Sequence, residues 1–137
     1  MRLVLDTNVL VSGLLTPKGS PGRVVDGILL GDLVLVVDDR ILEEYREVLA
    51  RPKFGFDVVQ RERLLVFLRT ASEQVVAPPV SVPLPDPDDL PFLEAALHAG
   101  VALVTGNARH FPIDLCRPVE ILGPAQVVAA WAVFGHR

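Results

Sequence analysis

Three short segments of this chain are apolar at every position, and polar residues follow each of them. The segments are residues 3–5, 33–37 and 101–104. A strand that is buried on both faces has this unbroken pattern, whereas a strand with one face in water alternates between apolar and polar residues. Because helices cover both faces of a parallel sheet, the three segments predict buried strands of such a sheet.

Helical patterns separate these strands. The spacing of apolar residues, together with Pro and Gly at the boundaries, predicts helices over about 9–15, 20–31, 39–50, 58–71, 88–100 and 124–134, and a last strand over 119–122. In the fourth of these helices, the core side is expected to carry Leu64, Leu65, Phe67 and Leu68. Helices that alternate with buried strands predict a three-layer α/β/α sandwich with a central parallel sheet.

The chain is expected to form one domain over residues 1–137. Half of its residues are hydrophobic, which is enough for one well-filled core at this length. Residues 77–91 are rich in proline and could suggest a linker between two domains. The residues after that stretch are close to the lower limit for independent folding, so we interpret it as a rigid surface connection.

Composition limits the class of protein. No apolar stretch is long enough for a membrane span and no signal-peptide pattern begins the chain, so we expect a cytoplasmic protein without a membrane partner. The single cysteine, Cys116, excludes an internal disulfide and a zinc site made of cysteines. The net charge of −4 does not attract nucleic acid over long range, so any such binding must depend on local basic residues.

Polar residues stand at the ends of the first and third apolar segments. Asp6 follows the first one, at the carboxyl end of a strand, where open parallel sheets bind ligands. A helix N-cap is an alternative role for Asp6, and the sequence leaves both roles open. Asn8 adds a polar group beside it that could hold a carboxylate or a metal-bound water. Thr105 and Asn107 follow the strand over 101–104 and offer oxygen ligands without charge.

The helix over 39–50 contains three glutamates, and only one of them is placed to reach inward. Its apolar side chains fall within an arc of about 120°, and Glu44 lies about 40° outside the edge of that arc. Glu43 and Glu47 point well away from it. A solvated glutamate on the flank of the helix remains the alternative for Glu44.

The helix over 88–100 carries an acid within its apolar stripe. Asp89 projects near the centre of that stripe, whereas Glu94 and His98 are expected to face solvent. Asp86 or Asp88 could cap this helix, but three aspartates in four residues exceed what a cap needs.

Asp6, Glu44 and Asp89 together predict a divalent cation. A desolvated carboxylate costs several kcal/mol unless it is paired, protonated or bound to a cation. Two carboxylates about 5 Å apart repel each other by roughly 3 kcal/mol at an effective dielectric constant of 20. A shared ion reverses the sign of that energy.

The histidines provide weaker signals. His110 could serve as a general base, but a lone histidine beside Phe111 and Pro112 is more typical of a structural role. His98 and His136 show no spacing that is typical of metal ligands.

Three stretches carry a resemblance to a known family: LVLDTNVLVSGLL at 3–15, ILEEYREVLARPKF at 41–54 and DPDDLPFLEAALHAGVALVTGNARHFP at 86–112. In this order they resemble the PIN-domain family, in particular the VapC-like toxins of toxin–antitoxin operons. The family's three acids match Asp6, Glu44 and Asp89, and its threonine matches Thr105. Many members have a fourth aspartate where this chain has Asn107, so a second metal position is expected to bind more weakly here.

The resemblance implies a metal-dependent endoribonuclease with Mg²⁺ or Mn²⁺ as cofactor. Asp6, Glu44 and Asp89 would hold the ion, and Asn107 would orient one of its waters, which attacks the RNA phosphodiester. The supporting residues would be Asn8, Thr105 and Asp86, and the cations that counter the acidic field for RNA would be Arg46, Arg51, Lys53 and Arg109. The implied partners are an RNA substrate, a cognate antitoxin protein and a second copy in a homodimer.

Two other functions are weighed against this one. A catalytically weakened PIN-like module that binds RNA or an antitoxin is favoured by Asn107 and by the acidic isoelectric point, and disfavoured by the three retained acids. A haloacid-dehalogenase-like hydrolase also has an aspartate after its first strand, but its second aspartate is replaced here by Asn8. The chain has no phosphate loop, nucleophile elbow or dinucleotide fingerprint, which counts against nucleotide hydrolases and dehydrogenases.

Overall fold

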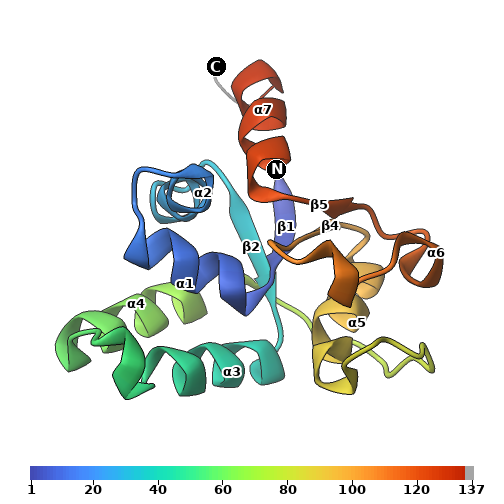
Figure 1. Cartoon of the computed structure of the whole chain (residues 1–137), viewed down its shortest axis with the longest axis horizontal. Coiled ribbons are helices and arrows are strands. Elements are labelled where there is room, and N and C mark those ends of the chain that lie inside the picture. Colours follow the sequence, from blue (N-terminus) through green and yellow to red (C-terminus); the bar gives the residue numbers. More distant parts are fainter. Residues whose placement is uncertain (135–137) are drawn as a thin grey trace.

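The computed structural model describes residues 1–134, and within them five strands form one parallel sheet (Figure 1). The strands are β1 (Arg2–Leu5), β2 (Val34–Val37), β3 (Glu73–Gln74), β4 (Ala102–Val104) and β5 (Ile121–Leu122). Their order is β3-β2-β1-β4-β5, and every neighbouring pair is parallel. The predicted parallel sheet is therefore confirmed. His136 lies outside the described residues.

Helices cover both faces of this sheet. They are α1 (Thr7–Leu15), α2 (Ser20–Leu29), α3 (Asp39–Leu49), α4 (Val58–Ala71), α5 (Leu90–Ala99), α6 (Ile113–Cys116) and α7 (Pro124–Phe134). In Figure 1, α1, α2 and α4 lie to the left of the sheet and α5 to the right, where α5 packs on β1, β2 and β4. The predicted α/β/α sandwich is confirmed.

The longer elements follow the sequence pattern closely because local signals set their ends. Asp38 caps α3 by accepting a hydrogen bond from the backbone N–H of Ile41 at 3.0 Å. At the C-terminal end of α5, Gly100 has the left-handed conformation (φ 68°) that lets the helix stop there. Neither α6 nor the 3₁₀ turns η1 (Pro52–Phe54), η2 (Pro87–Asp89) and η3 (Ala108–His110) are predicted from the sequence.

The edge strand β3 is also absent from the sequence prediction. It pairs with β2 through the registers Val36↔Glu73 and Val37↔Gln74. A strand of two polar residues has no apolar pattern to mark it. Its position is stabilised by tertiary contacts, among them the ion pair between Arg2 and Glu73 at 2.5 Å.

Two expectations about helix faces are wrong. Phe67 is 36% exposed instead of buried, because α4 lies at the outside of the fold and buries mainly Leu65 and Leu68. Glu94 was expected in solvent but is only 3% exposed. It faces inward because Arg40 and the backbone N–H of Val80 both donate hydrogen bonds to its carboxylate, at 2.6 Å and 2.8 Å.

The proline-rich stretch packs against the rest of the fold. Just before it, the backbone N–H of Val75 donates to Val37 O at 2.9 Å; within it, the backbone N–H of Val80 donates to Glu94 Oε2 and Leu84 is buried in the core. The stretch therefore runs as a strap from β3 to η2 and contacts both β2 and α5. No helix within residues 1–134 has the length and apolar character that crossing a membrane requires.

The strand order creates a switch point at the centre of the sheet. From β1 the chain moves to β2 and β3 on one side, and then returns to β4 and β5 on the other. Sheets of this kind bind ligands outside the carboxyl ends of the strands, where the order reverses. The carboxyl ends of β1 and β4 are followed by Asp6 and Thr105.

Candidate metal centre

Asp6 and Thr105 lie side by side at the carboxyl edge of the sheet, although 99 residues separate them in sequence. The backbone N–H of Asp6 donates to Val104 O at 2.9 Å, which extends the pairing of β1 with β4 to this point. The Thr105 hydroxyl then donates to Asp6 Oδ2 at 2.8 Å, and Asp6 is only 6% exposed. Burial raises the pKa of the Asp6 carboxyl, although the Thr105 hydrogen bond opposes the rise.

The capping alternative for Asp6 is only partly realised. Asp6 occupies the N-cap position of α1, and its carbonyl accepts from the backbone N–H of Val9 at 3.0 Å. Its side chain makes no capping hydrogen bond. The carboxylate is therefore available to other partners.

Glu44 is the half-buried glutamate of α3, while Glu43 and Glu47 are exposed, as the helical projection predicts. Its carboxylate accepts a hydrogen bond from the hydroxyl of Thr7. Next to it, the buried hydroxyl of Tyr45 donates to Leu5 O at 2.5 Å, which fixes this turn of α3 to the end of β1. Burial and the nearby charge of Asp6 raise the pKa of Glu44, whereas the Thr7 hydrogen bond lowers it.

Thr7 is a site residue that the sequence analysis missed. Its hydroxyl connects α1 to Glu44, so it helps to orient one of the three acids. The available signal was its position between Asp6 and Asn8, directly after the first strand. Such a residue also has strong helix-capping propensity, which conceals the second role.

Asp89 ends η2 and precedes α5, but it does not cap the helix. Asp86 caps the preceding turn η2, because its Oδ1 accepts from the backbone N–H of Asp88 at 3.0 Å. The Asp89 side chain is 13% exposed and makes no capping hydrogen bond. Burial, followed by the charges of Asp6 and Asp86, raises the pKa of Asp89 to about 6.

His110 lies against Asp89, a contact that is compatible with either of the two roles weighed for this histidine. Its Nδ1 lies 3.2 Å from Asp89 Oδ2, without the alignment of a regular hydrogen bond. In the described part of the chain, this buried carboxylate oxygen has no hydrogen-bond partner. The distance in sequence between the two residues explains why no local pattern reveals the contact.

Asn8 and Asn107 hold the loops around the acids. Asn8 Oδ1 accepts from the backbone N–H of Gly106 at 3.4 Å, so it connects the start of α1 to the loop after β4. The backbone N–H of Asn107 donates to the Thr105 hydroxyl at 3.0 Å. Thr105 is therefore hydrogen-bonded both to Asp6 and to Asn107, the residue that stands where many family members have an aspartate.

The donor set fits a divalent cation in its chemistry. Three carboxylates lie near one another at one edge of the sheet. Burial raises the pKa of all three, and the charges of nearby carboxylates raise it further for Glu44 and Asp89. Within residues 1–134, no lysine or arginine forms an ion pair with any of them. A bound cation would offset both the burial and the repulsion, and would give Asp89 Oδ2 or its companion oxygen a partner.

The carboxylates are near one another without forming a closed cage. In the described residues, no three His, Cys, Asp or Glu side chains form a ready ligand group. Mg²⁺ commonly binds through one or two carboxylates, with waters and substrate phosphates as its other ligands. An open group of acids is therefore compatible with such an ion, and one ion shared by all three acids stays a prediction.

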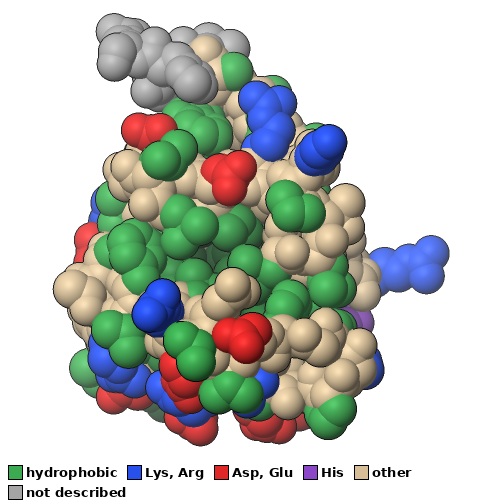
Figure 2. Space-filling view, turned by 90° about the vertical axis from the view of Figure 1, so that its left-hand side faces the viewer, with side chains coloured by type: hydrophobic (Ala, Val, Ile, Leu, Met, Phe, Trp, Pro, Cys, Tyr) green, Lys and Arg blue, Asp and Glu red, His purple; other side chains and the backbone are tan. Residues whose placement is uncertain are grey.

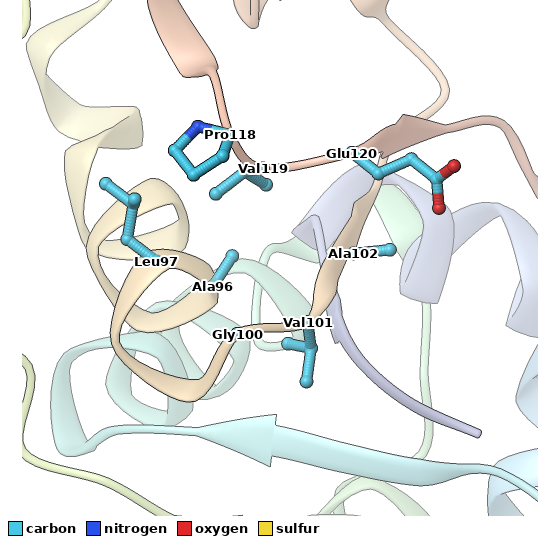
Figure 3. A pocket seen from close by; sticks show the side chains of 8 residues that line it. All are labelled: Ala96, Leu97, Gly100, Val101, Ala102, Pro118, Val119 and Glu120. Atoms are coloured by element: carbon cyan, nitrogen blue, oxygen red, sulfur yellow. The ribbon is translucent and has the colours of Figure 1, made fainter.

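A cavity of about 230 Å³ lies away from these acids, between the last turn of α5 and the segment that leads into β5 (Figure 3). Its wall is mostly apolar and is made of Ala96, Leu97, Gly100, Val101, Ala102, Pro118, Val119 and Glu120. The carboxylate of Glu120 points away from Leu97 and Pro118 in Figure 3. The cavity is at the beginning of β4, so it does not join the acids at the other end of that strand.

Comparisons with known proteins bear on the family and the fold of this chain. A family model described as PIN domain matches residues 2–109. An uncharacterized protein of Methanocaldococcus jannaschii is 28% identical over 110 residues, which cover 78% of this chain and 71% of that protein.

Two solved structures share the fold. VapBC2 from Rickettsia felis, bound to a DNA fragment from its promoter, gives a TM-score of 0.59 at 14% identity and covers 90% of this chain and 98% of that one. FitAB bound to the IR36 DNA fragment gives a TM-score of 0.56 at 17% identity, and the match covers 89% of this chain and 94% of that one.

Proposed function

Because the chain belongs to the PIN domain family, whose members are in general nucleases, we propose that it is a Mg²⁺- or Mn²⁺-dependent endoribonuclease. We further propose that it is the toxin of a toxin–antitoxin pair. The observation that carries the proposal is the group of Asp6, Glu44 and Asp89, which are drawn together at the switch point without a basic partner among residues 1–134.

The residues of the chain divide the work of the proposed reaction. Asp6, Glu44 and Asp89 would hold the cation, with Asp6 oriented by Thr105 and Glu44 by Thr7. When bound, such an ion activates a water for attack on the phosphodiester and stabilises charge on the leaving 3′ oxygen. Asn107 is proposed to orient that water, since its backbone is already fixed to Thr105.

The basic residues proposed to contact RNA differ in their surroundings. Arg46 pairs with Glu62 at 2.8 Å, Arg51 approaches Glu47 at 4.0 Å, and Lys53 lies 5.0 Å from the centre of the Phe54 ring. The exposed Arg109, beside His110, forms no ion pair in the described part of the chain. We therefore propose Arg109 as the main contact to RNA phosphates, since its charge is not already neutralised.

A protein partner is proposed from the fold relationship and from the surface. VapBC2 and FitAB are two-component complexes, and this chain shares the fold that they contain. Figure 2 shows hydrophobic side chains gathered around a hollow on the face that carries α2 and α4. A hollow of about 380 Å³ between the ends of α2 and α4 and the start of β2 is bordered by Leu29, Leu30, Val34 and Phe67. Exposed apolar patches of this kind are typical of protein interfaces.

The test of the enzymatic proposal is cleavage of single-stranded RNA by the purified chain. Cleavage should require Mg²⁺ or Mn²⁺ and stop with EDTA. In Asp89→Asn the cleavage rate should fall while RNA binding persists. The fall should exceed roughly 10- to 100-fold, which is the usual effect of removing a residue that only supports a metal ligand. The matched control is Asp32→Asn, which changes an exposed aspartate in the turn before β2 and should cleave like the wild type.

The outcomes separate the two candidate functions. Equal cleavage by the wild type and Asp89→Asn, purified in parallel, would identify a contaminating ribonuclease. RNA binding without metal and without cleavage over varied substrates would favour the binding module, which Asn107 also favours. In that case Asn107→Asp should still strengthen Mn²⁺ binding if the three acids form a metal site, since it adds a charged ligand.

The homodimer is tested separately. Light scattering of the purified chain should give twice the mass of one copy, and a mass of one copy at every concentration would contradict the proposed dimer.

A further inference from the structure

One contact at the carboxyl edge of the sheet has no role in the function proposed so far. His110 Nδ1 lies 3.2 Å from Asp89 Oδ2 without the alignment of a regular hydrogen bond, and no donor in residues 1–134 bonds to that oxygen. The two residues come from different elements, since His110 ends η3 and Asp89 ends η2. The imidazole is partly exposed, whereas the carboxylate is almost covered.

The backbone around His110 is held firmly. The N–H of His110 donates to Asn107 O at 3.1 Å, and the N–H of Phe111 donates to Ala108 O at 3.1 Å. Phe111 itself is fully buried, so it anchors the end of η3 in the core. The same short segment begins at Thr105, which bonds to Asp6. The imidazole is thus presented to Asp89 from the loop that also orients Asp6.

Among the residues that the structure describes, no hydrogen bond orients the Asp89 carboxylate. Its backbone N–H donates to Asp86 O at 3.1 Å, which fixes the main chain, but its side chain takes no part in capping. A carboxylate without a hydrogen-bond partner can rotate about its last bond. Cation binding must then fix that rotation, and the lost conformational entropy weakens the binding.

We propose that His110 is a positioning residue for Asp89. In this proposal the Nδ1–H, 3.2 Å away, would hold Oδ2 when the cation is bound, and Oδ1 would be left for the ion. This inference rests on the proposed function, because it assigns Asp89 to a metal site. A neutral imidazole suits the task, since it offers one donor without the positive charge with which an arginine or lysine would repel the cation.

The proposal makes a geometric prediction about substitutions. In asparagine the side-chain nitrogen is as many bonds from Cα as Nδ1 is in histidine, so His110→Asn keeps a donor near the same place. In glutamine the nitrogen is one bond further out, so His110→Gln should not reach Oδ2 in the same way. His110→Ala removes the donor altogether.

The experiment is Mn²⁺ titration by calorimetry on the full chain, with RNA cleavage as a second measurement. His110→Ala and His110→Gln should bind Mn²⁺ about 10- to 100-fold more weakly than the wild type, as is common when a ligand loses its outer partner. His110→Asn should bind nearly as tightly as the wild type. His98→Ala, which changes an exposed histidine at the other end of α5, is the matched control and should be unaffected.

Cleavage distinguishes positioning from general structural support. The defect of His110→Ala at limiting Mn²⁺ should disappear at saturating Mn²⁺, because only the affinity for the ion is impaired. A variant that melts earlier but binds Mn²⁺ like the wild type would assign His110 to structure and overturn the proposal. Equal affinities of His110→Asn and His110→Gln would overturn the geometric claim, even if the alanine variant does not fold.

One further variant separates this inference from the proposed function. Asp6→Asn should abolish Mn²⁺ binding if the acids form a metal site. If Asp6→Asn binds Mn²⁺ like the wild type, the metal centre itself is wrong. If Asp6→Asn loses binding while His110→Ala retains it, only the role of His110 is wrong.

Discussion

Two groups of buried or partly buried acids lie close to the sheet, and they differ in the partners that surround them. The compensated pair consists of Asp38 and Glu94, which are 5% and 3% exposed. Arg40 donates to Asp38 Oδ2 and to Glu94 Oε1, each at 2.6 Å. Arg40 Nε also donates to Asp38 Oδ2 at 3.0 Å, and the backbone N–H groups of Ile41 and Val80 donate to Asp38 and Glu94.

The site acids, Asp6, Glu44 and Asp89, have no such compensation. Their partners are the hydroxyls of Thr105 and Thr7 and the imidazole of His110, none of which brings the fixed positive charge of an arginine. Burial comes first among the causes that raise the pKa of all three acids, and neighbouring carboxylates add to it for Glu44 and Asp89.

We interpret the compensated pair as structural and the site acids as the group proposed for chemistry. The compensated pair joins the start of α3, the middle of α5 and the proline-rich strap, so its ionic bonds hold elements together. For the site acids, we expect the repulsion between neighbouring carboxylates to lower stability when no cation is bound. Uncompensated charge at a switch point is typical of functional sites, where a ligand supplies the missing partner.

The largest effect on stability is expected from removing the cation of the compensated pair. Arg40→Ala should lower the free energy of unfolding by about 3 kcal/mol, because it leaves two buried carboxylates without a counter-charge. Urea unfolding measures the change. Arg23→Ala, at an exposed position of α2, is the control and should change stability by no more than about 0.5 kcal/mol. A similar small effect in both variants would remove the distinction between the two groups.

The next effect is that of metal on the site acids. Mn²⁺ at 100 times its dissociation constant should stabilise the wild type by about 2.7 kcal/mol, because the ion binds only the folded chain. Thermal unfolding with and without Mn²⁺ measures this. Asp6→Asn should show no response, whereas Arg40→Ala, although less stable, should retain it. A response that persists in Asp6→Asn would contradict the assignment of Asp6 to the site.

Neutralising one acid should raise the free energy of unfolding in the group of site acids and lower it in the compensated pair. In EDTA at pH 7.5, Asp89→Asn should stabilise the chain by about 1 kcal/mol, because it removes a buried charge that its neighbours repel. Glu94→Gln should destabilise it, because Arg40 and Val80 lose the charge that they bind. Chemical unfolding of both variants under one condition gives the comparison, and equal signs would refute it.

The smallest effect is the pH dependence of the Asp89 contribution. Folding raises the pKa of Asp89 from 3.8 to about 6, so the folded state binds its proton more tightly than the unfolded state does. The protonated carboxyl therefore favours folding at low pH, and this contribution is lost as the pH rises through about 6. Without metal, the advantage of Asp89→Asn over the wild type should shrink as the pH falls from 7.5 towards 4.5. An advantage that grows on acidification would reverse the assigned sign.

The parts of the fold that depend on local pattern follow from the sequence. The helix over residues 58–71 and the one over 124–134 are predicted with the bounds that the structure has, because periodicity and capping residues are local. β3 escapes prediction, since two polar residues at a sheet edge have no pattern of their own.

The candidate site is predictable only in its main residues. Helical projection separates Glu44 from Glu43 and Glu47, and a strand end marks Asp6. His110 is interpreted as structural from its sequence neighbours alone, yet it contacts Asp89 across two elements.

The sequence by itself determined the parallel sandwich, the acids at its carboxyl edge and the resemblance to the PIN domain, because apolar periodicity and residue identity are properties of the chain. Only the tertiary structure decided which buried acids are compensated. Glu94 accepts a hydrogen bond from Arg40, a cation 54 residues away in sequence. Asp6 accepts one from Thr105, a neutral hydroxyl 99 residues away. The energy of a buried charge depends on what lies within a few ångströms of it, and folding, not sequence order, sets those distances.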